Sequence, residues 1–133
     1  MSVTEKELLR VREISKDVEK LAERVEELDT KLHGIGSPSL EPSYGNNGDD
    51  AKTNMIVALD KLVNLYKQRL TEYYDAMLDV EMTISRMPII QRQLIEYYYF
   101  DGMTWEKVAE KMNYSTARIY EMRNQTLERL KEM

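Results

Sequence analysis

Apolar residues recur alternately three and four positions apart along most of the first 86 residues, with charged residues between them. The first series lies within residues 1–33 and comprises Val11, Ile14, Val18, Leu21, Val25, Leu28 and Leu32. The second series lies within residues 51–86 and comprises Ile56, Leu59, Val63, Tyr66, Leu70, Tyr73, Met77, Val80 and Ile84. This spacing is typical of the heptad seam of a coiled coil. The sequence therefore predicts two long helices, each with an apolar stripe that must pack against another helix.

A segment rich in Gly, Ser, Pro and Asn, residues 34–50, separates the two series and predicts a flexible linker. We expect His33 and Gly34 to close the first helix, and Asp49 or Asp50 to cap the second. Such helices either fold back as an antiparallel hairpin within one chain or pair between two chains. The sequence leaves both arrangements open. We expect a homodimer through the N-terminal helices, because a chain this small otherwise exposes its seam.

Residues 87–133 predict a separate domain of three short helices. Pro88 suits the first turn of a helix, and it disfavours helical geometry at Met87 before it. We expect the first helix to end at Asp101-Gly102. The fold class that follows is all-α: an N-terminal coiled coil or helical hairpin, then a C-terminal three-helix domain.

The last two helices of this domain meet at a short corner. Thr104 and Ser115 are placed to cap them, and Asn113 is able to adopt the left-handed conformation at the corner, which we expect Tyr114 to fill. Apolar spacing predicts that the first of these helices buries Trp105, Val108, Ala109 and Met112, and that the second buries Ile119, Met122, Thr126, Leu127 and Leu130. A short helix, a three-residue corner and a longer helix form the helix-turn-helix arrangement.

The outward side of the last helix carries the candidate contacts to double-stranded DNA. Helical spacing places Thr116, Ala117, Tyr120, Glu121 and Asn124 on this side, Arg118 and Gln125 at its edge and Arg123 nearer the core boundary. Lys107 on the preceding helix is a further candidate. Asn124 is suited to pair with adenine, and Glu121 to accept from the cytosine amino group. Arg118, Arg123 and Lys107 are suited to contact phosphates. This pattern predicts a sequence-specific DNA-binding protein.

The charge distribution limits how strongly one copy holds DNA. Of the net charge of −5, residues 1–34 carry −2, residues 35–86 carry −3 and residues 87–133 carry zero. Phosphate contacts supply most non-specific affinity, so a neutral domain binds weakly by itself. A second copy or another protein is expected to help.

Several classes of function are excluded by what the sequence lacks. The chain has no cysteine and one histidine, which argues against a disulfide framework, a bound metal or a cofactor. No set of Ser, His and acid and no glycine-rich phosphate loop indicates an enzyme. No apolar run is long enough for a signal peptide or a membrane span, and we expect a cytoplasmic protein.

The stretch MTWEKVAEKMNYSTARIYEMRNQTLERL resembles the region-4 helix-turn-helix of bacterial RNA polymerase sigma factors, which recognise the −35 promoter element. The resemblance covers Pro88–Leu130, and it implies that Thr116, Ala117, Tyr120 and Glu121 occupy base-reading positions. The whole chain resembles small phage and prophage regulators of the ArpU/RinA type. Thr116 and Ala117 depart from the charged or long polar residues usual in sigma factors, so the promoter sequence does not carry over.

Three functions are compatible with these observations. The leading hypothesis is a regulator of late phage genes that binds near a promoter and engages RNA polymerase. The second is a DNA-packaging recognition subunit like the small terminase subunits, which also join a helix-turn-helix to a coiled-coil stem. The third is an adaptor whose sigma-like domain binds RNA polymerase without reading DNA.

Overall fold

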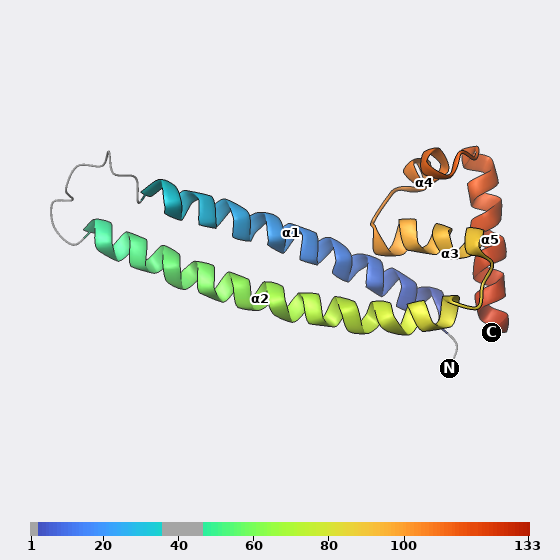
Figure 1. Cartoon of the computed structure of the whole chain (residues 1–133), viewed down its shortest axis with the longest axis horizontal. Coiled ribbons are helices and arrows are strands. Elements are labelled where there is room, and N and C mark those ends of the chain that lie inside the picture. The colour runs from blue at the N-terminus through green and yellow to red at the C-terminus, as the bar shows by residue number, and fades with distance from the viewer. Residues whose placement is uncertain (1–2, 36–46) are drawn as a thin grey trace. The chain divides into compact units, whose positions relative to one another are not determined.

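The computed structural model describes residues 3–35 and 47–133, in which every regular element is a helix (Figure 1). The elements are α1 (Glu5–Ile35), α2 (Asn47–Ile84), α3 (Ile89–Ile95), the π-helix η1 (Glu96–Phe100), α4 (Trp105–Met112) and α5 (Thr116–Glu132). The all-α expectation is confirmed. Most of the expected linker, residues 36–46, lies outside the described residues.

The helices form two compact units. One, which we call the terminal unit, combines residues 3–16 with residues 71–133, and the other, the hairpin unit, contains the described residues between 17 and 70. Both α1 and α2 are long enough to contribute to each unit. The terminal unit therefore joins the first turns of α1 to the helices that follow α2, although about 70 residues separate them in the sequence.

Within the hairpin unit, α1 and α2 run antiparallel (Figure 1). The α1 seam faces inward: Leu21 is buried, and Val18, Val25, Leu28 and Leu32 are half-buried. Within this unit the α2 seam is half-buried from Leu59 to Leu70, whereas Ile56 is 48% exposed. One chain therefore covers its own seam, and an exposed seam is no longer a reason to expect a homodimer.

The end of α1 and the start of α2 differ from the sequence expectation, the former by two residues and the latter by about one turn. The helix α1 continues through Gly34 to Ile35, and α2 begins at Asn47, so that Asp49 and Asp50 lie in its first turn instead of capping it. A carboxylate such as that of Asp50 is favourable in the first turn because the positive end of the helix dipole lies there. His33 lies in the last turn of α1 as expected, with Nδ1 2.8 Å from the carbonyl oxygen of Asp29.

The terminal unit contains two apolar clusters. The larger one combines residues from both ends of the chain: Val3, Leu8, Val11, Val80, Ile84, Met87, Ile95, Tyr99, Phe100 and Leu130. Leu8, Ile84 and Ile95 are completely buried in it. Because this core includes α1 and α2, the helices after Pro88 bury only part of their apolar surface against one another.

The smaller cluster is the core of the helix-turn-helix and consists of Leu94, Val108, Ala109, Ile119 and Met122. Its local geometry confirms the expected caps. Thr104 Oγ1 accepts from the Lys107 backbone N–H at 3.2 Å, and Ser115 Oγ accepts from that of Arg118 at 3.1 Å. Asn113 has φ = 60°, the expected left-handed conformation. Tyr114, expected to fill the corner, is instead 38% exposed.

The helix that begins after Pro88 reaches Phe100 as expected, but its last turn is the π-helix η1. There the backbone N–H of Asp101 donates to the carbonyl of Glu96 at 2.9 Å, five residues back. The chain then leaves the helix at Gly102, whose φ of 73° suits glycine. The wider turn leaves backbone carbonyls at the end of η1 open to partners from elsewhere in the fold.

The neighbours Leu8 and Leu9 test whether α1 belongs to the core of the terminal unit. Leu8 is completely buried and Leu9 is 46% exposed. Leu8→Ala should lower the free energy of unfolding by about 3 kcal/mol, and Leu9→Ala by no more than about 0.5 kcal/mol. The only tryptophan, Trp105, reports unfolding of this unit in urea by its fluorescence. Equal stability of the two variants would contradict the placement of α1.

Candidate nucleic-acid interface

The outward side of α5 is open to solvent over its first half. Ser115 caps the helix, and the next residue, Thr116, is its first residue. The exposed candidate residues on α5 are Thr116, Ala117, Arg118, Tyr120, Glu121, Asn124 and Gln125. Their spacing places Thr116, Tyr120 and Asn124 on one face, while Ile119 and Met122 on the opposite side are buried in the core. The cap and the apolar anchors therefore hold a largely polar surface toward solvent.

Two of the candidate residues pair with each other on this surface. Arg118 Nη1 donates to Glu121 Oε2 at 3.1 Å, and the side chains are 49% and 65% exposed. An exposed pair at i, i+3 contributes only about 0.3–0.5 kcal/mol. Little free energy is therefore needed to open it and to turn Arg118 toward a phosphate and Glu121 toward a base.

The remaining exposed candidates differ in how firmly they are held. Tyr120 is 38% exposed, with its ring centroid 6.4 Å from that of Trp105, so one side packs and the other faces solvent. Asn124 and Gln125 line a shallow polar hollow further along α5. The side chain of Lys107 on α4 is 71% exposed, and its Nζ lies 3.9 Å from Glu110 Oε2. Each of these side chains is accessible to a ligand.

Arg123 lies closer to the core than the other candidates. It is half-buried, and its guanidinium carbon lies 5.8 Å from the centroid of Trp105. It also lines a hollow together with Thr4 and Glu5 at the start of α1. The expected phosphate contact of Arg123 stays a prediction, and the structure adds a packing role for this residue.

A stack of planar groups connects α1 with α5. Tyr98 and Trp105 lie face to face, with centroids 3.8 Å apart and an interplanar angle of 8°. The guanidinium carbon of Arg12 lies 3.9 Å from the centroid of Tyr98, and Arg123 approaches Trp105 at the other end. Stacked aromatic rings and cations over ring faces contribute about 0.5–2 kcal/mol per pair. The stack therefore passes from α1 through η1 and α4 to the exposed helix.

Polar groups of α1 also cap the end of η1. Arg12 Nη1 donates to the carbonyl oxygens of Tyr98 and Met103, the latter at 3.0 Å. Ser15 Oγ donates to the carbonyl of Phe100 at 2.8 Å. The last carbonyls of a helix lack partners within it, and charged donors make the stronger hydrogen bonds. The first turns of α1 thus complete the helix-turn-helix unit.

The sequence did not single out Arg12 and Ser15, because neither belongs to the apolar seam of the first helix. The one local signal is their position, since each directly follows a seam residue, Val11 and Ile14. Their partners lie more than 80 residues away in the sequence. No local pattern identifies such partners.

Burial changes the ionisation of several groups near the contact between α1 and η1, which we call the junction. Burial, with a smaller contribution from Glu5, raises the pKa of the Tyr99 hydroxyl to about 12. Burial and the neighbouring Glu81 carboxylate raise the pKa of Glu96, and burial raises that of Asp101. Tyr99 therefore stays neutral at physiological pH, and the two carboxylates are less favourable in the folded than in the unfolded chain.

No group of three or more His, Asp or Glu side chains in the described part of the chain is arranged to hold a metal ion. None of the helices in residues 3–35 and 47–133 combines the length and the apolar character needed to cross a membrane.

The comparison with protein families identifies the C-terminal segment. Residues 83–132, which are 50 of the 133 residues, match the model described as Sigma-70, region 4. This segment is a sigma region 4-like helix-turn-helix. It contains α3, η1, α4 and α5. The match confirms the resemblance to sigma region 4 that the sequence indicated for Pro88–Leu130. Neither the curated proteins nor the solved structures include a match to this chain.

Replacing Arg12 by lysine should weaken the junction while keeping the charge. Lysine lacks the planar group that stacks on Tyr98 while donating to two carbonyls. We expect Arg12→Lys to lower the free energy of unfolding by about 1–2 kcal/mol. Arg10→Lys, on the exposed side of α1, is the matched control and should change it by less than about 0.5 kcal/mol. Urea denaturation followed by Trp105 fluorescence measures both, and equal values would contradict the role of Arg12.

Replacing Glu96 by glutamine should raise Tm at pH 7. Because its folded-state pKa is raised, protonation of Glu96 stabilises the fold, and this contribution is lost as pH rises through the folded pKa. The neutral amide removes that loss at pH 7, and the gain should vanish near pH 4, where the acid is largely protonated. Calorimetry across this range measures the difference, with the exposed Glu13→Gln as control. A gain that is equal at both pH values would exclude ionisation as its cause.

Proposed function

We propose that this protein is a sequence-specific, double-stranded DNA-binding transcription regulator and not an enzyme. The observation that carries the proposal is the polar, exposed first half of α5, which is capped by Ser115 and anchored by Ile119 within a segment that matches Sigma-70, region 4. A helix held in this way enters the major groove in helix-turn-helix proteins. The likeness to ArpU/RinA-type regulators makes late phage transcription the context that we favour.

The side chains of α5 divide by the chemistry they offer to DNA. Asn124 and Glu121 carry the amide and the carboxylate that distinguish adenine and cytosine edges, and Tyr120 offers an apolar ring to thymine methyl groups. Arg118 and Lys107 carry exposed charges suited to phosphates. We therefore assign base discrimination to Tyr120, Glu121 and Asn124.

Net charge argues that the domain does not act alone. The zero balance of residues 87–133 gives little of the electrostatic attraction on which DNA binding usually depends. We propose that contact with RNA polymerase or with a second copy supplies the missing affinity. A homodimer through the N-terminal helices stays a prediction, since the hairpin unit already packs its own seam.

The same charge balance favours one second candidate, an adaptor that binds RNA polymerase through the sigma-like domain without reading DNA. Seven basic and seven acidic residues in 87–133 give such a domain a mixed surface, and mixed charges suit contacts with another protein. Selection of bound duplexes from a random pool separates the two functions. An enriched sequence supports the DNA reader, and no enrichment supports the adaptor.

Substitutions on α5 should separate contacts that specify a sequence from contacts that only hold DNA. Asn124→Ala should weaken the selected duplex by about 1–3 kcal/mol and leave a scrambled duplex nearly unaffected. Arg118→Ala should weaken both and reduce the salt slope by about one unit, because a phosphate contact releases counterions. Lys131→Ala, at the far end of α5, removes the same charge and should change neither. Fluorescence anisotropy across a salt series measures these effects, and wild-type behaviour of all three variants would contradict the assignment.

A further inference from the structure

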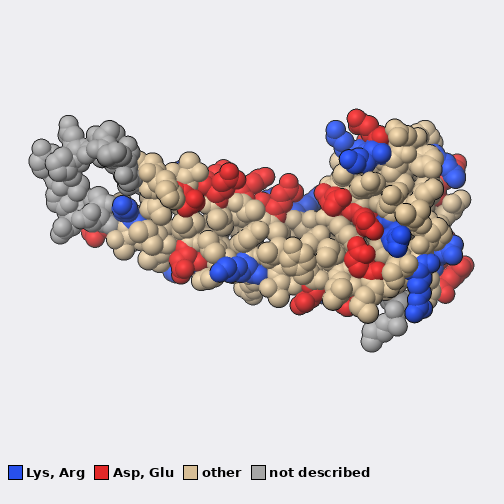
Figure 2. All heavy atoms as spheres, in the orientation of Figure 1, with Lys and Arg blue, Asp and Glu red and all other residues tan. Residues whose placement is uncertain are grey.

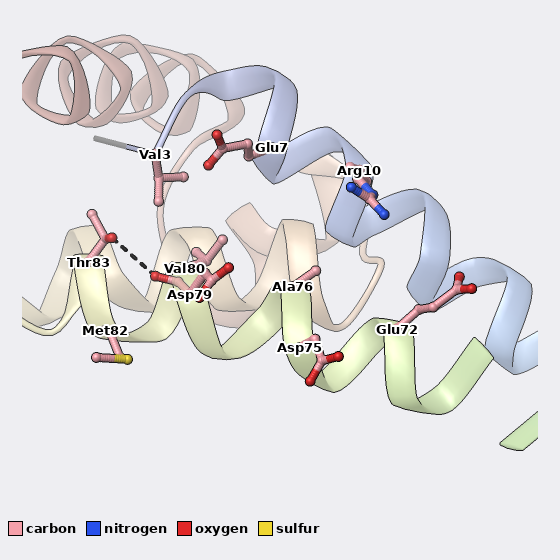
Figure 3. Close-up of a pocket in the computed structure, with 10 residues that line it drawn as sticks. All are labelled: Val3, Glu7, Arg10, Glu72, Asp75, Ala76, Asp79, Val80, Met82 and Thr83. Atoms are coloured by element: carbon pink, nitrogen blue, oxygen red, sulfur yellow. Dashed lines mark hydrogen bonds between the residues drawn. The ribbon is translucent and has the colours of Figure 1, made fainter. Parts of the chain in front are cut away.

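A groove lies between the first turns of α1 and the last turns of α2 (Figure 3). Its volume is about 600 Å³, and all the residues that line it belong to the terminal unit. The small side chains of Val3, Ala76 and Val80 form an apolar floor, and Val3 and Val80 are buried. The groove exists because these short side chains leave the space between the two helices unfilled on this side.

Charged side chains from both helices surround the floor (Figure 3). Glu7 comes from α1, and Glu72, Asp75 and Asp79 come from α2, whereas Arg10 is the one cation among the lining residues. Four carboxylates and one guanidinium give the lining a net charge of −3. An apolar floor within acidic walls favours an occupant with the opposite charge pattern.

The groove is separate from the proposed DNA-binding surface. Of its lining residues, only Thr83 falls within the segment that matches Sigma-70, region 4, and none lies on α4 or α5. Its acidic walls repel phosphates, so a nucleic acid is a poor occupant. A second copy of the same groove is also a poor occupant, because like charges would face each other across the interface.

The length of the groove indicates a helical occupant. Along α2 it extends from Glu72 to Thr83, which at a rise of 1.5 Å per residue is roughly 17 Å, or three helical turns. A helix laid beside α1 and α2 buries its apolar stripe against the floor and keeps its flanks near the walls. The bound helix, α1 and α2 would then form a three-helix bundle.

An exposed apolar stripe continues at the outer edge of the groove. Met82, which lines the groove, is 67% exposed, and Leu78 and Tyr74, four and eight residues before it, are 57% and 53% exposed. Three large apolar side chains in one row on a helix are typical of an interaction surface. A methionine at its edge adapts readily to the shape of a partner.

We propose that this groove binds an amphipathic helix of a partner protein, one whose apolar stripe is flanked by lysine and arginine. The groove gives the protein a docking surface that is independent of DNA. The floor, the walls and the stripe all lie outside α5, so binding of this helix does not depend on the proposed function. It is therefore testable whether or not α5 reads DNA.

A designed peptide supplies the probe for the full-length protein. It is a fluorescein-labelled helix of about 18 residues with leucines on one face and lysines on both flanks, at about 0.15 M salt. Asp75→Asn with Asp79→Asn should weaken its binding about tenfold, and Met82→Ser, which leaves the charge unchanged, about fivefold. Glu19→Gln with Glu26→Gln removes the same charge from exposed positions of the hairpin unit and should change binding by less than about twofold.

A peptide of the same composition with its leucines scrambled off the common face should bind at least about tenfold more weakly than the helix. The proposal is overturned if the scrambled peptide binds as well, if the control pair loses as much affinity as the groove pair, or if the wild type binds neither peptide. Sedimentation provides a further check. A wild-type dimer that Met82→Ser dissociates would assign the surface to a second copy and would likewise overturn the proposal.

Discussion

The contact of Arg12 with the end of η1 is the interaction on which the terminal unit depends. Its guanidinium stacks on Tyr98 and donates to the carbonyl oxygens of Tyr98 and Met103. The carbonyl of Tyr98 at the end of η1 and that of Met103 in the following connection need donors, and Arg12 supplies both. Residue 12 thereby orders the platform of Tyr98 and Trp105, against which Tyr120 and Arg123 of α5 pack.

The compact unit extends beyond the segment that matches Sigma-70, region 4. The match to Sigma-70, region 4 begins at residue 83, but the compact unit that contains it also includes the first turns of α1 and the last turns of α2. The helix-turn-helix supplies the exposed surface, and Val3 together with residues of the two long helices supplies half of the larger apolar cluster. They also form the acidic groove, which the matched segment by itself does not contain. The proposed docking groove and the proposed DNA-binding surface therefore lie on one compact unit.

Local chemistry allowed much of this fold to be predicted. The caps at Thr104 and Ser115, the left-handed Asn113 and the burial of Ile119 follow from residues within a few positions of each other. The heptad stripes indicated two long helices, but their spacing is the same for a hairpin and for a dimer. The start of α2 was misplaced by a turn because Asp is common both as a cap and in the first turn.

What sequence analysis missed depends on contacts between distant residues. Arg12 and Ser15 look like ordinary solvated side chains until their partners beyond residue 97 are known. The wide turn of η1 and the exposure of Tyr114 likewise depend on the packing around them. Among the candidate site residues, the exposed side of α5 followed from the helical period alone. The helical period did not predict that Arg123 packs on Trp105.

Native-state hydrogen exchange tests most directly whether α1 is divided between two cooperative units. If residues 8–16 of α1 belong to the terminal unit, their amides should open with the same free energy as those of the buried part of α5, residues 119–130. The amides of residues 18–32 in the same helix should open separately, and more easily, because their seam is mostly half-buried. Uniform exchange along the whole of α1, at rates distinct from those of α5, would contradict the account.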